Sequence, residues 1–134
     1  MEQIDAIKEF SELMDLARLL QAPGGCSWDK KQSLSDWGKC LAEEHLELIE
    51  AIEEDDPAMI REEFGDTLFV LLAMAVTCER RGVMDLAGSL AEVREKMVRR
   101  HPHVFGDSSA DTPEKVLKQW GEIKKTEKGG SQAE

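Results

Sequence analysis

Two neighbouring stretches of the sequence carry acidic side chains at helical spacing. The first contains Glu43, Glu44 and Glu47, and the second contains Glu63 and Asp66. Because an α-helix turns by about 100° per residue, residues three or four apart share a face, and each stretch presents its carboxylates on one side of a helix. Carboxylates gathered in one place are hard oxygen ligands of the kind that Mg²⁺ and Mn²⁺ prefer. The spacing therefore indicates a divalent-cation site.

The alternative for the first stretch is an ordinary solvated helix face, which lysines at four-residue spacing would support. No lysine or arginine lies between Glu43 and Glu54, so the crowded like charges call for an external cation. Asp66 directly precedes the apolar run 67–76, where an aspartate is costly to bury unless something neutralises it. The alternative for Asp66 is a buried pair with an arginine, or a cap on a neighbouring helix.

A short turn connects the two acidic stretches. Asp56 suits an N-cap and Pro57 the first helical position, so the sequence predicts helices over 34–54 and 57–81. Helices joined by so short a turn run antiparallel, and the acids of both lie at comparable distances from it. We therefore expect four carboxylates to face each other across the interface: Glu44, Glu47, Glu63 and Asp66.

Sulfur and imidazole ligands are not expected in this site, since only Cys40 could share its face. A di-iron carboxylate centre in a helical bundle uses Glu-x-x-His pairs. No glutamate stands three residues before His45, His101 or His103. The sequence therefore disfavours a di-iron centre.

The rest of the chain also predicts helices, with Ser33 or Ser35 capping the helix over 34–54 and Gly82 ending the helix over 57–81. Apolar residues recur at helical spacing over 2–20, and a loop with the sequence GGCSWDKKQ follows the break at 22–25. Further helices are expected over 85–100 and 112–125, with an irregular loop between them. The fold class expected is all-α: an antiparallel bundle of about four core helices plus a C-terminal helix. We expect one domain over 1–127 and a disordered tail over 128–134.

The run 67–76 is apolar on every side, which a surface helix of a small monomer does not tolerate. It lies either at the centre of the bundle or partly against a second subunit. The second possibility predicts a homodimer.

Basic residues are densest in one short run, which contains Arg94, Lys96, Arg99 and Arg100. Lys96 and Arg100 share a helix face and could bind phosphate, although basic residues near a helix C-terminus also complement the helix dipole. Trp28 stands beside Asp29 and Lys30 in the glycine-rich loop. It could stack on a base or simply cover the end of the bundle.

Composition excludes several functional classes. The chain has 28 acidic and 17 basic residues and a net charge of −11, which argues against binding a nucleic acid polymer or an anionic membrane. The longest apolar run, Leu68–Val76, is about half as long as a membrane span, and no secretory signal opens the chain. Cys26, Cys40 and Cys78 form no CxxC pair, which favours reduced thiols in a cytoplasmic protein.

Taken together, these motifs resemble the MazG-type nucleotide pyrophosphohydrolases, part of the all-α NTP pyrophosphatase group. The resemblance is carried by GGCSWDKKQ (24–32), EEHLELIEAI (43–52), REEFGD (61–66), EKMVRRHPHVFGD (95–107) and KQWGEIKK (118–125). The family signature, Glu-Glu-x-x-Glu followed by Glu-x-x-Asp, is matched by 43–47 and 63–66.

The resemblance implies Mg²⁺-dependent hydrolysis of a nucleoside triphosphate to the monophosphate and pyrophosphate, with Mn²⁺ as a substitute ion. It implies a homodimer or a dimer of dimers. The implied metal ligands are Glu44, Glu47, Glu63 and Asp66, with Glu43 as a nearby acid that orients the attacking water. The implied substrate-binding residues are Trp28, Asp29, Lys30, Lys96 and Arg100.

Two alternatives are compatible with the same residues. A non-catalytic helical module with an acidic face for a basic partner would explain the net charge, but it has no need for matched acids on two facing helices. A metal-dependent hydrolase of another phosphoanhydride would need the same metal site.

Overall fold

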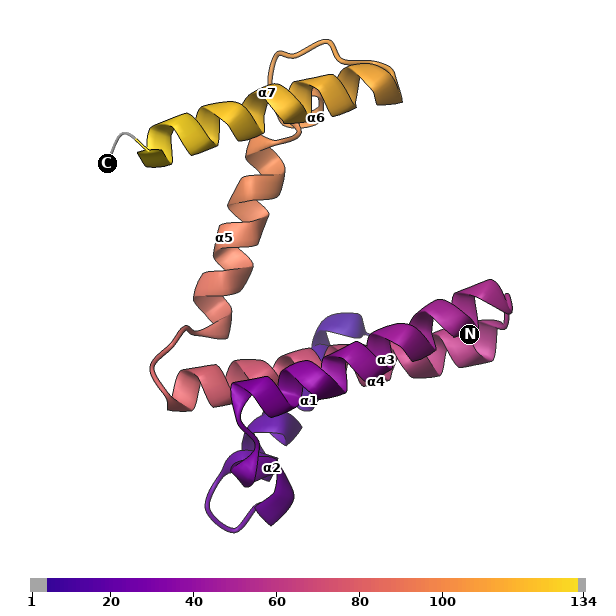
Figure 1. The fold of residues 1–134 in the computed structure, drawn as a ribbon, viewed down its shortest axis with the longest axis vertical. Coiled ribbons are helices and arrows are strands. Elements are labelled where there is room, and N and C mark those ends of the chain that lie inside the picture. The colour runs from indigo at the N-terminus through magenta and orange to yellow at the C-terminus, as the bar shows by residue number, and fades with distance from the viewer. Residues whose placement is uncertain (1–4, 133–134) are drawn as a thin grey trace. The chain divides into compact units, whose positions relative to one another are not determined.

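The structure is a computed structural model that describes residues 5–132 (Figure 1). The described residues form seven helices and no strand, which confirms the all-α class. The helices are α1 (Ala6–Gln21), α2 (Ser27–Lys31), α3 (Leu34–Glu53), α4 (Pro57–Arg80), α5 (Leu86–Arg99), α6 (Pro102–Phe105) and α7 (Pro113–Gln132). The chain divides into two compact units, Met1–Leu86 and Ala87–Glu134, and each is described by itself.

Capping residues define the ends of the two acidic helices as predicted. Ser33 and Asp36 form a capping box at the start of α3, in which each side chain accepts a hydrogen bond from the other residue's backbone N–H. Asp56 caps α4 by accepting from the backbone N–H groups of residues 58 and 59, and Pro57 takes the first helical position. Gly82 follows the end of α4 with a φ of +68°, the left-handed conformation that glycine adopts without strain.

The first helix begins later than the periodicity predicted. The side chain of Asp5 accepts hydrogen bonds from the backbone N–H groups of Ile7 and Lys8, which starts α1 at Ala6 rather than near Glu2. The predicted residues 1–4 lie outside the described part of the chain. The predicted loop over 24–32 is also different, because residues Ser27–Lys31 form the short helix α2.

Helix α4 is the centre of the first unit and packs against both α3 and α1, which run alongside it in Figure 1. Its apolar run is buried at Val70, Leu72, Ala73, Ala75 and Val76. Leu72 and Val76 pack with Met14 and Ala17 of α1, whereas Val70 and Ala73 pack with Trp37 of α3. Leu71 is 44% exposed, so the run is not covered on every side within this unit.

The second unit begins at Ala87, the second residue of α5. It also contains α6 and α7. Residues Pro102–Phe105 form α6 within the segment predicted as an irregular loop. Helix α7 continues to Gln132, past the predicted end near Lys125 and through most of the tail 128–134 for which disorder was predicted. The imidazole of His101 and the indole of Trp120 meet edge to face, with ring centroids 5.3 Å apart. The packing of a fourth helix into the bundle stays a prediction.

The cysteines Cys26, Cys40 and Cys78 are all free thiols, as predicted. Among the described residues, none of the helices combines the length and the apolar character that crossing a membrane requires.

Candidate metal centre

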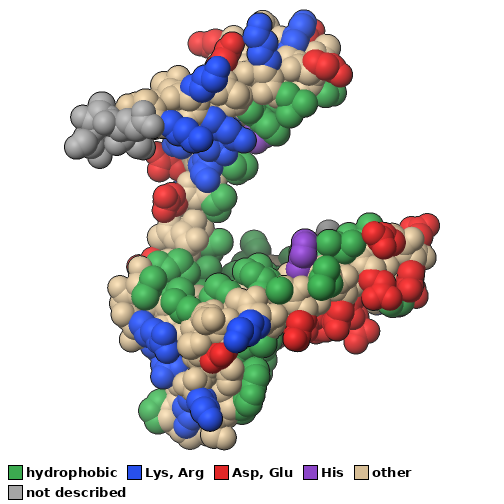
Figure 2. Space-filling model, in the orientation of Figure 1, with side chains coloured by type: hydrophobic (Ala, Val, Ile, Leu, Met, Phe, Trp, Pro, Cys, Tyr) green, Lys and Arg blue, Asp and Glu red, His purple; other side chains and the backbone are tan. Residues whose placement is uncertain are grey.

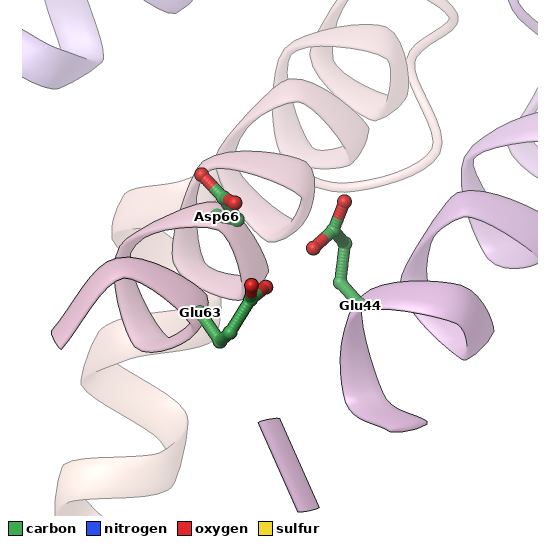
Figure 3. Close-up of side chains that lie close together, drawn as sticks. All are labelled: Glu44, Glu63 and Asp66. Carbon is green, nitrogen blue, oxygen red and sulfur yellow. The ribbon is translucent and has the colours of Figure 1, made fainter. Parts of the chain in front are cut away.

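Three of the predicted carboxylates converge between α3 and α4. Glu44 comes from α3, and Glu63 and Asp66 come from α4, with one carboxylate oxygen of each within 4.8 Å of the others. Figure 3 shows the Glu44 side chain extending from its helix toward the pair on α4. The antiparallel hairpin creates this arrangement, because residues at equal distance from the 54–56 turn lie opposite each other.

Thr67 connects the two helices at the level of these carboxylates. Its hydroxyl donates to the backbone carbonyl of Glu63 at 2.7 Å, and it lies 3.5 Å from the carbonyl oxygen of Glu44 on the facing helix. The Thr67 hydroxyl thus lies between the backbone carbonyl groups of Glu63 and Glu44. Sequence reasoning missed Thr67; the available signal was a hydroxyl residue directly after the acidic motif.

The electrostatics of the cluster favour a positive ion. Burial raises the pKa of Glu63 to about 7, and contact with Glu47 together with repulsion from Glu47, Asp66 and Glu44 adds to the effect. Burial also raises the pKa of Glu44, followed by repulsion from Glu47 and Asp66. Glu44 Oε2 and Glu63 Oε2 are buried and accept no hydrogen bond from the described residues. Two orphaned oxygens among like charges fit a divalent cation.

Glu47 and Glu43 lie beside the cluster on α3. Both side chains are exposed, and Glu47 is near enough to affect the pKa of Glu44 and Glu63. Glu47 does not belong to the tight three-carboxylate group. The charge of Glu43 adds to burial in raising the pKa of the Cys40 thiol. The ligand role of Glu47 and the acid role of Glu43 stay predictions. Figure 2 shows the acidic side chains gathered along the hairpin toward its turn.

The predicted nucleoside-binding residues lie on α2. Trp28 is 54% exposed and packs edge to face on the buried Trp37 of α3, with ring centroids 5.6 Å apart and planes at 86°. Asp29 is buried and Lys30 is half-buried. The short helix thus leaves the Trp28 ring open to solvent on one side and supported on the other.

The predicted phosphate-binding residues belong to the second unit. Lys96 is half-buried on α5. Arg100 follows α5 and makes a two-point ion pair with Glu127, Nε to Oε1 at 3.2 Å and Nη2 to Oε2 at 3.3 Å. Because the units are described separately, the approach of Lys96 and Arg100 to the carboxylates stays a prediction.

A buried polar network near Trp37 was also missed by sequence reasoning. It contains Gln21 at the end of α1 and Thr77, which directly follows the apolar run of α4. The available signal was the presence of polar residues at positions that the helical period assigns to the core, because a buried polar residue needs a hydrogen-bond partner.

Comparison with known proteins identifies the family. A family model described as the MazG nucleotide pyrophosphohydrolase domain matches residues 32–105. The chain is 42% identical over 120 residues to the nucleoside triphosphate pyrophosphohydrolase/pyrophosphatase MazG of Thermotoga maritima, covering 90% of this chain and 46% of that protein. It is 37% identical over 128 residues to the nucleoside triphosphate pyrophosphohydrolase of Escherichia coli K12, covering 96% of this chain and 47% of that protein.

The chain thus spans about half the length of these two curated relatives. A solved structure of a mazG-related protein from Thermotoga maritima superimposes with a TM-score of 0.73 at 32% identity, covering 86% of this chain and 98% of that one. The resemblance carried by the acidic motifs is therefore confirmed. The chain belongs to the MazG nucleotide pyrophosphohydrolase domain family.

Proposed function

We propose that this protein hydrolyses nucleoside triphosphates to the monophosphate and pyrophosphate in the presence of Mg²⁺. The observation that carries the proposal is the convergence of Glu44, Glu63 and Asp66 within 4.8 Å, where two buried carboxylate oxygens accept no hydrogen bond from the described residues. A site of this kind selects a hard divalent ion, and a hard ion with free positions binds phosphate oxygens. Family membership supplies the class of substrate.

Glu44, Glu63 and Asp66 hold the metal ion, and Glu47 joins them from the neighbouring turn of α3. When bound, Mg²⁺ or Mn²⁺ neutralises phosphate charge and lowers the pKa of a nearby water. Glu43 accepts the proton of the attacking water as general base. Lys96 and Arg100 bind the phosphates and stabilise the charge of the departing pyrophosphate. Trp28, Asp29 and Lys30 bind the nucleoside.

We also propose that the chain forms a homodimer, alone or within a dimer of dimers, through one face of the α3–α4 hairpin. The support is a set of apolar side chains left open to solvent there: Leu46 (66% exposed), Ile49 (37%), Phe64 (61%) and Leu71 (44%). Leu71 also lines a shallow pocket with Leu41, Ala42 and His45. Exposed apolar surface of this extent marks an interaction site.

The test of the catalytic proposal is pyrophosphate release from a panel of common, oxidised and deaminated nucleoside triphosphates with and without Mg²⁺. Glu47→Gln and Asp66→Asn keep the side-chain shape and remove one negative charge each. Both are expected to abolish Mg²⁺-dependent release, with far-UV circular dichroism unchanged. Full activity in either variant would refute its assignment, and an inactive wild-type protein across the panel would refute the function.

A further inference from the structure

A chain of buried hydrogen bonds links three helices of the first unit. The indole Nε1–H of Trp37 on α3 donates to Thr77 Oγ1 on α4 at 2.9 Å. The Thr77 hydroxyl in turn donates to Oε1 of Gln21, the last residue of α1, at 2.9 Å. Gln21 Nε2 donates to the backbone carbonyl of Ala73 at 2.9 Å, and Arg80 donates to Gln21 Oε1 at 3.0 Å.

This network holds Trp37 in one orientation. Trp37 and Thr77 are 2% and 1% exposed, so neither can exchange its partner for water. The only polar atom of the indole is bonded, and so are both polar atoms of the Gln21 amide. Rotating the Trp37 ring would leave a buried N–H and a buried hydroxyl without their mutual partner, which is costly.

Trp37 in turn supports Trp28. The two rings meet edge to face, a favourable aromatic geometry, and Trp28 keeps 54% of its surface exposed. Helix α2 contains five residues, too few to be stable on its own, so its position depends on such contacts. The side chain of Gln32 closes the short helix by donating to the carbonyl of Trp28 at 2.8 Å.

Trp37, the ring that supports Trp28, lies on the same helix as Glu44 of the metal centre. Trp37 and Glu44 are seven residues apart on α3, so they share a helix face and are separated by about 10 Å along the axis. That separation is comparable to the reach of a nucleotide from its base to its phosphates. A base stacked on Trp28, which packs on Trp37, would thus lie near the level of Trp37 on α3, about one nucleotide length from the level of Glu44.

We infer that Thr77, acting through Trp37, is a positioning residue that fixes Trp28 as the stacking platform for the base of the substrate. This inference rests on the proposed function and adds a determinant of substrate affinity that lies in the core. Stacking on an exposed aromatic accepts any base, so the platform contributes affinity for the nucleoside class rather than selection among bases.

The test compares Thr77→Val, which keeps the shape and removes the hydroxyl, with Thr77→Ser, which keeps the hydroxyl. Steady-state pyrophosphate release from ATP is measured with Mg²⁺. Trp28→Ala is expected to raise KM about tenfold, the effect of losing one stacked base. Thr77→Val is expected to raise KM about fivefold with kcat unchanged, since the hydrogen bond that orients the Trp37 indole is lost. Thr77→Ser is expected to restore the wild-type KM.

A double-mutant cycle separates positioning from a general loss of stability. If Thr77 acts through Trp28, Thr77→Val adds nothing to KM once Trp28 is alanine. Near-ultraviolet circular dichroism gives a readout independent of activity: the tryptophan signal of the Trp28–Trp37 pair should decrease in Thr77→Val and be retained in Thr77→Ser. Should Thr77→Val fail to fold, Trp37→Phe takes its place in every arm, with the same expected KM.

Three results would overturn the inference. They are a wild-type KM in Trp28→Ala, a wild-type KM in Thr77→Val, and additive effects in the double variant. Each of these, found in an enzyme whose wild type releases pyrophosphate, leaves the proposed function in place. A wild-type protein with no pyrophosphate release from any nucleoside triphosphate would refute both together.

Discussion

Replacing Asp66 by asparagine should change the melting temperature of the protein differently without and with Mg²⁺. Asp66 supplies one of the carboxylate oxygens that lie within 4.8 Å of each other. Asparagine keeps the shape and removes one negative charge. Without metal, the variant loses repulsion from Glu44 and Glu63, so we expect its melting temperature to equal or exceed that of the wild type.

The magnitude with metal follows from linkage. At a Mg²⁺ concentration 100 times the wild-type Kd, binding stabilises the folded state by about 2.7 kcal/mol. Loss of a direct ligand should weaken binding about 100-fold, the upper end of what loss of an outer-shell partner causes. The same Mg²⁺ then stabilises Asp66→Asn by only about 0.4 kcal/mol. For a domain of this size, the Mg²⁺-induced rise in melting temperature falls from about 10 °C to about 2 °C.

The assay is thermal unfolding followed by circular dichroism, with a Mg²⁺ titration for each protein. Glu53→Gln is the matched control, because it removes the same charge from α3 at a position nine residues after Glu44, on the opposite side of the helix. The control should respond to Mg²⁺ like the wild type. A Mg²⁺-induced rise in Asp66→Asn as large as that of the wild type would refute Asp66 as a ligand.

Three further predictions concern pH, the α2 segment and the dimer. The pKa of Glu63 rises from 4.5 to about 7 on folding, so the free energy of unfolding of the metal-free protein should decrease as the pH rises from about 4.5 to about 7. Melting temperatures measured in chelator should show this decrease, and Glu63→Gln should abolish it. Gly25→Ala should destabilise the fold and displace α2, because a Cβ at this position would clash with the backbone carbonyl oxygens of Leu19 and Leu20; denaturant unfolding that matches the wild type would contradict this clash. Phe64→Glu should convert the proposed dimer to a monomer in analytical ultracentrifugation, whereas the same sedimentation coefficient for variant and wild type would contradict the proposed interface.

The parts of the fold that local sequence determines were predictable. Ser33, Asp56 and Pro57 mark helix starts because their side chains or fixed backbone angles satisfy the first turn directly. The facing of Glu44 with Glu63 and Asp66 followed from the same signals, since the turn at 54–56 determines the register of the hairpin.

The features that depend on tertiary contacts were not predictable. Helix α2 lies in a segment whose glycines and proline indicate a loop, and its Trp28 is supported by Trp37 from another helix. The pairing of Gln21 with Thr77 joins residues 56 positions apart, and no local pattern reports such a contact. Helix α7 continues past its predicted end near Lys125 and through Gly129, a residue of low helix propensity.

The most direct test of the central claim is an anomalous diffraction experiment on crystals of the protein soaked with Mn²⁺. The proposed metal centre predicts an anomalous difference peak between the carboxylates of Glu44, Glu63 and Asp66, within coordination distance of oxygens from both α3 and α4. Clear density for these side chains with no peak between them, or with the ion bound at a different site, would contradict it.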